Sequence, residues 1–182
     1  MRYTNTAIAL HWLMVLAIAA AASLGLYMTG LSFSPQKLKL YSWHKWTGVT
    51  LFLLAAARVF WRATHAVPRL PPATPRWQRR AASATHAALY VLVFVIPLSG
   101  WLMSSALGVQ TVYLGLLPLP NLLAKNKELG EALKSVHAAL NWTLAAVVLV
   151  HAGAALKHHF VERDDVLHRM LPWIRPRGGQ PK

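Results

Sequence analysis

The sequence predicts an all-α membrane protein, a four-helix transmembrane bundle with both termini on the cytoplasmic side. Three observations favour this class. Of the 182 residues, 55% are hydrophobic and only 13% are charged, and the mean hydropathy is +0.37. Four apolar stretches are each about 20 residues long, which is the length that a helix needs to cross a bilayer core of about 30 Å. Most of the basic residues flank these stretches on one side of the predicted bundle, the side of the N-terminus.

The four helices are expected at about residues 7–29, 43–61, 85–106 and 136–158 of a single domain that covers residues 1–182. The first ends near Gly30, and the second contains the run GVTLFLLAAARVFW. The third is centred on LYVLVFVIPLSGWLM, where Pro97 predicts a kink because it removes a backbone hydrogen bond. The fourth contains HAALNWTLAAVVLVHAGAAL. The lengths of these runs disfavour the alternative, a soluble bundle with unusually apolar helices.

The basic residues predict the orientation of the bundle and argue against a nucleic-acid partner. The formal net charge is +14, but the positive residues lie between or beside apolar runs, where membrane lipid is the expected partner. Thirteen of the 19 Lys and Arg residues, among them Arg175, Arg177 and Lys182, fall on the side of the N-terminus. The positive-inside rule therefore puts both termini in the cytoplasm.

Histidine is the residue type from which we expect any metal chemistry. The chain has no cysteine, which excludes disulfides, zinc-thiolate sites and cysteine-bound iron–sulfur clusters. An ionisable group at membrane depth is costly, so each one is a candidate for function. Five such residues lie inside or at the mouth of the expected spans: His11, His44, His86, His137 and His151.

Four of these histidines are expected to meet in two couples. His137 and His151 lie fourteen residues apart on one helix, so they share nearly one stripe with a separation of about 21 Å along the axis. The topology puts His44 level with His137 at the outer end and His11 level with His151 at the inner end. Two neutral imidazoles suit the axial ligation of a haem iron that passes electrons. Zinc would usually need three or four ligands at one depth, whereas polar packing or a proton relay remains an alternative.

Other residues near these couples have two interpretations each. Arg58 either pairs with a haem propionate or extends to lipid headgroups. His86 either serves a quinone or proton-transfer site or makes an interfacial hydrogen bond, and His65 and His168 are expected at the surface. Small residues would let a flat macrocycle fit between helices, although close helix packing explains them equally well. They are Gly25, Gly48, Ala55, Gly100, Ala145 and Ala146.

Several motifs, spread over nearly the whole chain, resemble the bacterial cytochrome b561 family. They are IALHW, WHKWTG, THAALYVLVFVIPLSGWLM, VHAALNWTLAAVVLVHAGAALKHHF and VLHRMLP. The chain is also similar to the cytochrome b subunits of nickel hydrogenases and formate dehydrogenases. The resemblance implies a bacterial inner-membrane protein with two haem b groups, whose axial ligands are His11, His44, His137 and His151. It further implies that the tandem His158 and His159 belongs to a quinone-side segment.

The compact members of that family include a superoxide oxidase, which implies a specific reaction here. Periplasmic superoxide would be oxidised to oxygen and ubiquinone, as substrate or bound acceptor, would be reduced. The outer loops carry six lysines against Glu128 and Glu131, and this positive surface either attracts a small anion or is a solvated rim. The six are Lys37, Lys39, Lys45, Lys125, Lys127 and Lys134.

Two other functions remain open from the sequence. In the first, the chain keeps its haems but is an electron-transfer subunit that accepts electrons from a periplasmic dehydrogenase or cytochrome partner. In the second, it is a haem-free membrane transporter or scaffold that uses its histidines for proton transfer or packing. The absorption spectrum of a b-type haem would separate the second from the rest.

Overall fold

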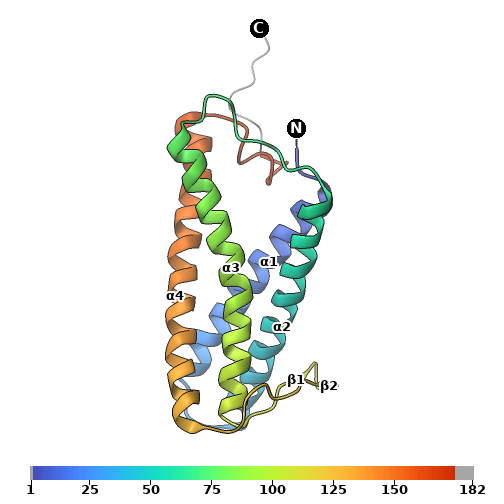
Figure 1. Ribbon diagram of the computed structural model, residues 1–182, viewed down its shortest axis with the longest axis vertical. Coiled ribbons are helices and arrows are strands. Elements are labelled where there is room, and N and C mark those ends of the chain that lie inside the picture. Colours follow the sequence, from blue (N-terminus) through green and yellow to red (C-terminus); the bar gives the residue numbers. More distant parts are fainter. Residues whose placement is uncertain (1, 175–182) are drawn as a thin grey trace.

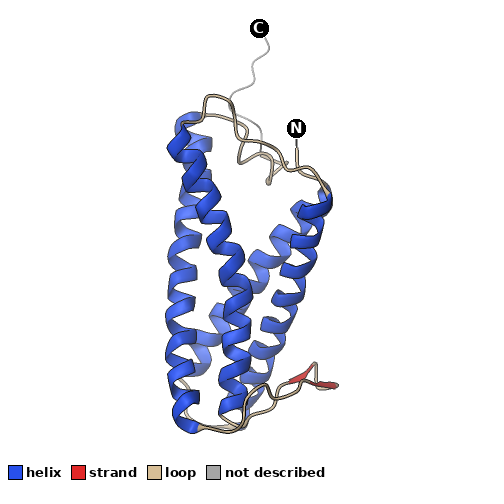
Figure 2. Cartoon of the chain, viewed as in Figure 1, coloured by secondary structure: helices blue, strands red, loops and turns tan. Residues whose placement is uncertain are grey.

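The computed structural model of the chain describes residues 2–174, and four long antiparallel helices form most of it (Figures 1 and 2). They are α1 (Asn5–Thr29), α2 (Pro35–Thr64), α3 (Arg76–Ala106) and α4 (Lys127–Lys157). A small hairpin of two strands, β1 (Val112–Tyr113) and β2 (Leu117–Pro118), lies between α3 and α4. A π-helical turn, η1 (His158–Glu162), follows α4. The predicted all-α class is confirmed.

Three helices begin about two turns before the apolar stretches that predicted them, so the expected starts at residues 43, 85 and 136 are wrong. An apolar run marks only the part of a helix that suits lipid, whereas capping residues hold the polar first turns of α2 and α4. The helix α3 begins after Pro75 without a side-chain cap. The Ser34 hydroxyl accepts a hydrogen bond from the Lys37 N–H at the start of α2. The Asn126 side chain accepts one from the Leu129 N–H at the start of α4.

The helices α1, α3 and α4 are long and apolar enough to cross a membrane. The helix α2 has 30 residues and packs along α1, yet it is less apolar than the other three. Lys45 lies near one end of its expected span and Arg58 near the other. The chain is therefore a membrane protein with three candidate spans, and a crossing by α2 stays a prediction.

The bundle turns many of its large apolar side chains outward, as a lipid-facing surface does. Leu149 on α4 is 73% exposed and Leu16 on α1 is 65% exposed. A soluble bundle would bury such side chains against its other helices. Two small buried clusters join the helices, one of Met14, Leu51, Ala55 and Val93, the other of Leu92, Ile96 and Leu144.

The kink expected at Pro97 does not interrupt α3, which continues as one helix from Arg76 to Ala106. Proline has no backbone N–H, so one carbonyl in the preceding turn loses its helical partner. The hydroxyl of Ser99 turns back into this region and donates to the carbonyl oxygen of Ile96 at 2.7 Å. This hydroxyl also contacts a candidate site residue on α4, as described below.

The start of α1 and the segment that follows α4 lie at the same end of the bundle. The Trp12 indole N–H donates to the Met170 carbonyl at 2.9 Å, and the Trp61 indole N–H donates to the Thr4 hydroxyl at 2.8 Å. We call this end the inner end and the opposite end the outer end, after the predicted orientation. The membrane face that each one occupies stays a prediction, and the inner residues Arg175, Arg177 and Lys182 lie outside the described residues.

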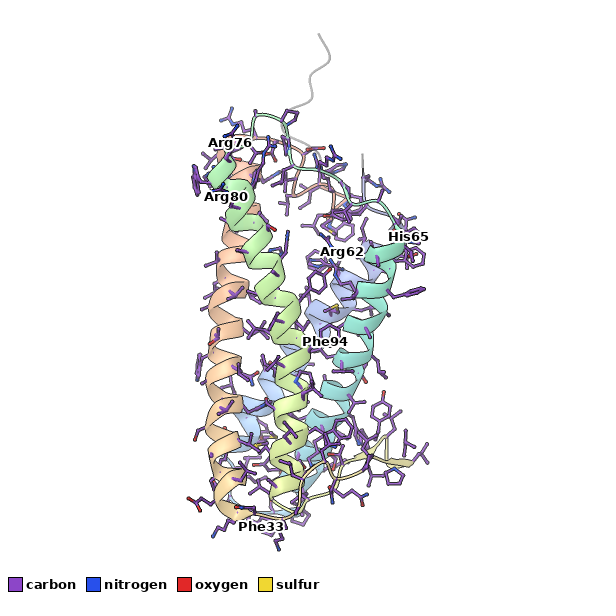
Figure 3. The ribbon with its side chains drawn as sticks, viewed as in Figure 1. Phe33, Arg62, His65, Arg76, Arg80 and Phe94 are labelled. Atoms are coloured by element: carbon purple, nitrogen blue, oxygen red, sulfur yellow. The ribbon has the colours of Figure 1, made fainter. Side chains whose placement is uncertain are left out.

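Figure 3 marks the two ends with labelled side chains. Arg62 and His65 at the end of α2, and Arg76 and Arg80 at the start of α3, lie at the inner end. Phe33, in the loop between α1 and α2, lies at the outer end. Phe94 lies midway along the bundle, where its ring meets that of Phe52 edge to face at 5.2 Å.

Candidate functional site

At the outer end, His44 of α2 and His137 of α4 face each other. Their ring centres lie 6.2 Å apart, and the two ring planes cross at 82°. An imidazole nitrogen bonds a first-row metal at about 2.0 Å and lies about 1.1 Å from its own ring centre, so two opposed ligands put their ring centres about 6.2 Å apart. The separation therefore leaves room for one metal ion between the two rings.

Hydrogen bonds at the outer end fix which nitrogen of each imidazole is free. The Nδ1 atom of His44 lies 2.9 Å from the carbonyl oxygen of Ala21, and because a carbonyl only accepts, Nδ1 must carry the proton. The Nδ1 atom of His137 lies 2.9 Å from the Ser99 hydroxyl, which already donates to Ile96 and so accepts here. In both rings Nε2 is left with its lone pair, the form that binds a metal.

Two glycines give these histidines the space that they occupy. A Cβ atom at Gly25 of α1 would lie 3.3 Å from Cε1 of His44. A Cβ atom at Gly100 of α3 would lie 3.2 Å from Cε1 of His137. Both contacts would be tighter than ordinary van der Waals distance, so side chains here would displace the rings. The backbone of α1 therefore lies close to the His44 ring, and the backbone of α3 lies close to the His137 ring.

At the inner end, His11 of α1 and His151 of α4 form the second couple. Their ring centres lie 6.2 Å apart with the planes at 64°, which again matches two ligands on one metal ion. His86 of α3 lies nearer to His151, with 5.3 Å between ring centres. That distance is about 1 Å too short for a metal ion between opposed rings. The ring separation therefore fits a shared metal ion for His11 and His151 better than for His86 and His151.

Arg58 of α2 supplies a positive charge beside the inner couple. Its Nη1 donates to the Ala7 carbonyl at 3.0 Å, and its Nε donates to the Tyr90 hydroxyl at 3.3 Å. Both acceptors are neutral, and among residues 2–174 we find no carboxylate paired with this guanidinium. The same residues line a pocket that also includes Arg62 and His65. An anionic group of a cofactor could therefore be bound here.

The predicted quinone-side residues His158 and His159 do not join the inner couple. The Nδ1 atom of His158 lies 2.6 Å from Oδ2 of Asp164 and 2.7 Å from Oε2 of Glu162. Among the described residues, these three form the group whose potential metal-ligand atoms all lie within 4.8 Å of one another. His159 is buried and its ring meets that of Phe160. No hydrogen bond or ring contact found in the described part of the chain connects either histidine with His86.

Sequence reasoning missed two side chains of the site. Ser99 was not expected to contact His137, because the rotation of α3 against α4 decides that contact and no spacing in the sequence reports it. Tyr90 was not expected beside Arg58 for the same reason. Gly25 and Gly100 were among the small residues named from the sequence, and the structure places them against the rings of His44 and His137.

Two imidazole couples at opposite ends of one apolar helical bundle are typical of one class, the membrane proteins that hold metal cofactors between helices. Comparison with known proteins gives the family. A family model described as prokaryotic cytochrome b561 matches residues 2–173. The chain therefore belongs to the prokaryotic cytochrome b561 family of membrane electron-transfer proteins, and that family implies bound haem b. The chemistry of the donor set fits a haem iron with two axial imidazoles.

Relatives with assigned names support the same conclusion. The chain is 35% identical to "Cytochrome b561 homolog 2" of Escherichia coli (strain K12), over 93% of this chain and 91% of that protein. It is 32% identical to "Cytochrome b561 homolog 1" of the same organism, over 94% of this chain and 97% of that protein. It is 27% identical to "Probable superoxide oxidase CybB" of Yersinia pestis, over 94% and 96%. Because the family binds haem b, the haem-free transporter or scaffold is set aside.

Proposed function

We propose that the chain is a di-haem cytochrome b that carries electrons across the inner membrane of a bacterium. In this proposal all four helices cross the bilayer, both termini are cytoplasmic, and one haem lies near each membrane face. His44 and His137 would hold the outer haem through their imidazoles, and His11 and His151 would hold the inner haem. The observation that carries the proposal is the ring separation of 6.2 Å, found in both couples.

The side chains around each couple would bind and orient the cofactor. Haem b, when bound, supplies reversible one-electron chemistry that amino acid side chains lack. The Ala21 carbonyl and the Ser99 hydroxyl keep the outer imidazoles in the tautomer that presents Nε2. Arg58 would donate hydrogen bonds to a propionate of the inner haem. The apolar walls of the bundle would exclude water from both couples.

We further propose that superoxide is the electron donor and ubiquinone the acceptor. Two superoxide anions would each lose one electron at the outer end and leave as oxygen, and one quinone would take up both electrons and two protons at the inner end. The name of the Yersinia pestis relative supports this reaction. The balance of six lysines against two glutamates at the outer end also supports it, since a positive surface concentrates a small anion.

The structure shows which of these outer lysines have bonding partners and which are exposed. Lys134 pairs with Glu131 at 3.2 Å, and Lys45 donates to the Val109 carbonyl at 3.2 Å. Lys39 lies over the ring of Trp43, and both Lys39 and Lys127 are exposed. The last two lysines therefore have charges that are free to attract an anion in solution, and they are suited to mutation without loss of a buried contact.

At the inner end, His86 would serve the uptake of protons by the quinone, with His158 and His159 as further candidates. His86 lies against the inner couple, and His158 is hydrogen-bonded to Asp164 near the end of the bundle. An imidazole has one nitrogen that can accept a proton and one that can donate a proton, so a chain of such groups can pass protons from the cytoplasm to a membrane site.

The test is superoxide consumption by purified protein in liposomes that contain ubiquinone. We expect consumption well above the uncatalysed rate, formation of ubiquinol, and a rate that falls as salt screens the surface charges. The variant Lys39→Gln/Lys127→Gln should be slower at low salt, whereas Arg76→Gln/Arg80→Gln, which removes two exposed charges from the inner end, should match the unchanged protein. If haem-loaded protein consumed superoxide no faster than the uncatalysed reaction, superoxide would be excluded as the electron donor. The remaining donor would then be a periplasmic dehydrogenase or cytochrome partner.

A further inference from the structure

The connection between α3 and α4 is unusually apolar for a loop at the end of a membrane bundle. Residues 107–124 contain no charged side chain. The tip of the β1–β2 hairpin within it carries Leu114, Leu116 and Leu117, which are 54%, 85% and 57% exposed. A loop in water is normally polar, so three outward leucines at one tip indicate a surface with an apolar partner.

The hairpin lies alongside α2, not beyond the end of the bundle (Figure 1). The Trp46 indole N–H donates to the Val112 carbonyl at 2.6 Å, and the hydroxyls of Thr50 and Tyr113 are hydrogen-bonded at 2.9 Å. Thr50 lies inside the apolar run GVTLFLLAAARVFW of α2, two residues after its first residue, Gly48. The hairpin therefore reaches the part of α2 that would lie in lipid in the proposed four-span topology.

Hydrogen bonds within the hairpin pair several of its backbone polar groups, which lowers the cost of contact with lipid. Val112 pairs with Pro118 and Tyr113 with Leu117, and the Leu119 N–H donates to the Thr111 carbonyl at 2.8 Å. The turn between the strands uses left-handed backbone at Leu114 and Gly115. Left-handed backbone at leucine is uncommon, and here it keeps a large apolar side chain at the tip where a polar residue would be usual.

We infer that this hairpin inserts into the outer leaflet beside α2, with Leu114, Leu116 and Leu117 among the lipid acyl chains. The partner is lipid because the hairpin is uncharged and continues the outward apolar surface of the helices at their own depth. The hairpin also pairs the Thr50 hydroxyl and the Trp46 indole N–H of α2, the helix that is not apolar enough to qualify as a span. The hairpin thus acts as an apolar cover that lets α2 lie in the membrane. This inference does not depend on haem or on the electron donor.

The experiment uses the absence of cysteine in the natural chain. The variant Leu116→Cys is labelled with an environment-sensitive fluorophore in liposomes, and quenching by nitroxide-bearing phosphatidylcholine is compared with quenching by aqueous iodide. Leu149→Cys on the outward face of α4 is the lipid-facing reference, and Asn121→Cys in the same loop is the water-facing reference. All three positions are exposed on the bundle, so labelling should leave the fold intact.

We expect the label at residue 116 to follow the reference at residue 149, with several-fold stronger quenching by the lipid nitroxide than by iodide. Quenching by iodide to the extent seen at residue 121 would overturn the inference. Shielding from both quenchers would also overturn it, because it would mean that protein covers the tip. If that shielding disappeared on dilution of the protein in lipid, the cover would be a second copy of this chain.

Discussion

The outer and inner histidine couples share one ring separation but differ in what surrounds them. Each outer imidazole has a hydrogen-bond acceptor at Nδ1, and a glycine backs each ring. Among the hydrogen bonds of the described residues, none involves the ring of His11 or His151. The inner couple instead has a third imidazole and an arginine beside it.

Under the proposed function, this difference would correspond to separate tasks for the two ends. The outer couple is fixed by its hydrogen bonds and tight packing, which suits an electron carrier that should not rearrange. The inner couple is surrounded by groups that can hold charge or exchange protons, which suits a site where electrons and protons meet. The predictions below test this contrast, from the largest expected effect to the smallest.

Removal of an outer ligand should have the largest effect. We expect His137→Ala to lose the outer haem and to keep the inner one, so that about half of the haem absorbance per protein remains. A redox titration of the remaining α-band should then fit one component. The matched control is Lys134→Ala, one turn earlier on α4, since the side chain of Lys134 is exposed and pairs with Glu131. Equal loss of both haems in folded protein would contradict the assignment of separate couples.

Removal of the hydroxyl behind His137 should have an intermediate effect. Ser99→Ala takes away the acceptor for Nδ1–H, and such outer partners typically contribute about 10-fold or more to metal binding. We expect faster transfer of haem from this variant to an acceptor protein, confined to the outer site. Thr143→Ala serves as control, because its hydroxyl only bonds the Ala139 carbonyl on the exposed side of α4. Identical transfer rates would show that Ser99 does not support the ligand.

His86 should matter for protons and not for haem retention. Because its ring is too close to that of His151 to share an iron, His86→Ala should keep both haems with a small shift in the inner α-band. The dependence of quinone reduction on pH should change if His86 supplies protons. Loss of the inner haem would instead identify His86 as a ligand in place of His11.

The smallest effect concerns the segment after α4, outside the membrane. The Arg169 guanidinium bonds both carboxylate oxygens of Asp165, at 2.7 and 3.1 Å, and this hydrogen bonding lowers the pKa of Asp165. The stabilisation is present above the unfolded pKa of about 3.9 and is lost as pH falls through the lower folded value. Because the Asp165 side chain is about half exposed, water screens the pair and its contribution is at most about 1 kcal/mol.

Arg169 also donates to the Arg69 carbonyl at 2.6 Å, so the ion pair helps to hold this segment against the loop before α3. We expect hydrogen exchange in residues 164–171, corrected for its intrinsic pH dependence, to accelerate below about pH 4. In Asp165→Asn the acceleration should already be present at pH 6. Unchanged protection at both pH values would show that the pair does not fasten the segment.

The sequence predicted the histidine couples because their main determinant is local. The spacing of His137 and His151 within one helix fixes two depths, and antiparallel topology then brings one histidine of α1 and one of α2 to those depths. Ser99 and the Ala21 carbonyl could not be predicted, because contacts between helices depend on how each helix is rotated. His86 was expected at the inner mouth, but its place against His151 depends on the same rotation.

The helix starts and the outer hairpin show a different limit. Apolar length predicts where a helix can lie in lipid, whereas Ser34 and Asn126 set where α2 and α4 begin, several polar residues earlier. The hairpin is fixed by hydrogen bonds to α2 from residues that look like ordinary loop. Gly115 was the one local sign of a turn with positive φ.

The haem content of the fully loaded, unmodified protein tests the central claim most directly. A pyridine haemochrome assay, referred to protein by amino acid analysis, should find two haem b groups per chain, and one in the double variant His44→Ala/His137→Ala. A value of one in the unmodified protein, or a double variant that still holds two, would contradict the account of two imidazole couples.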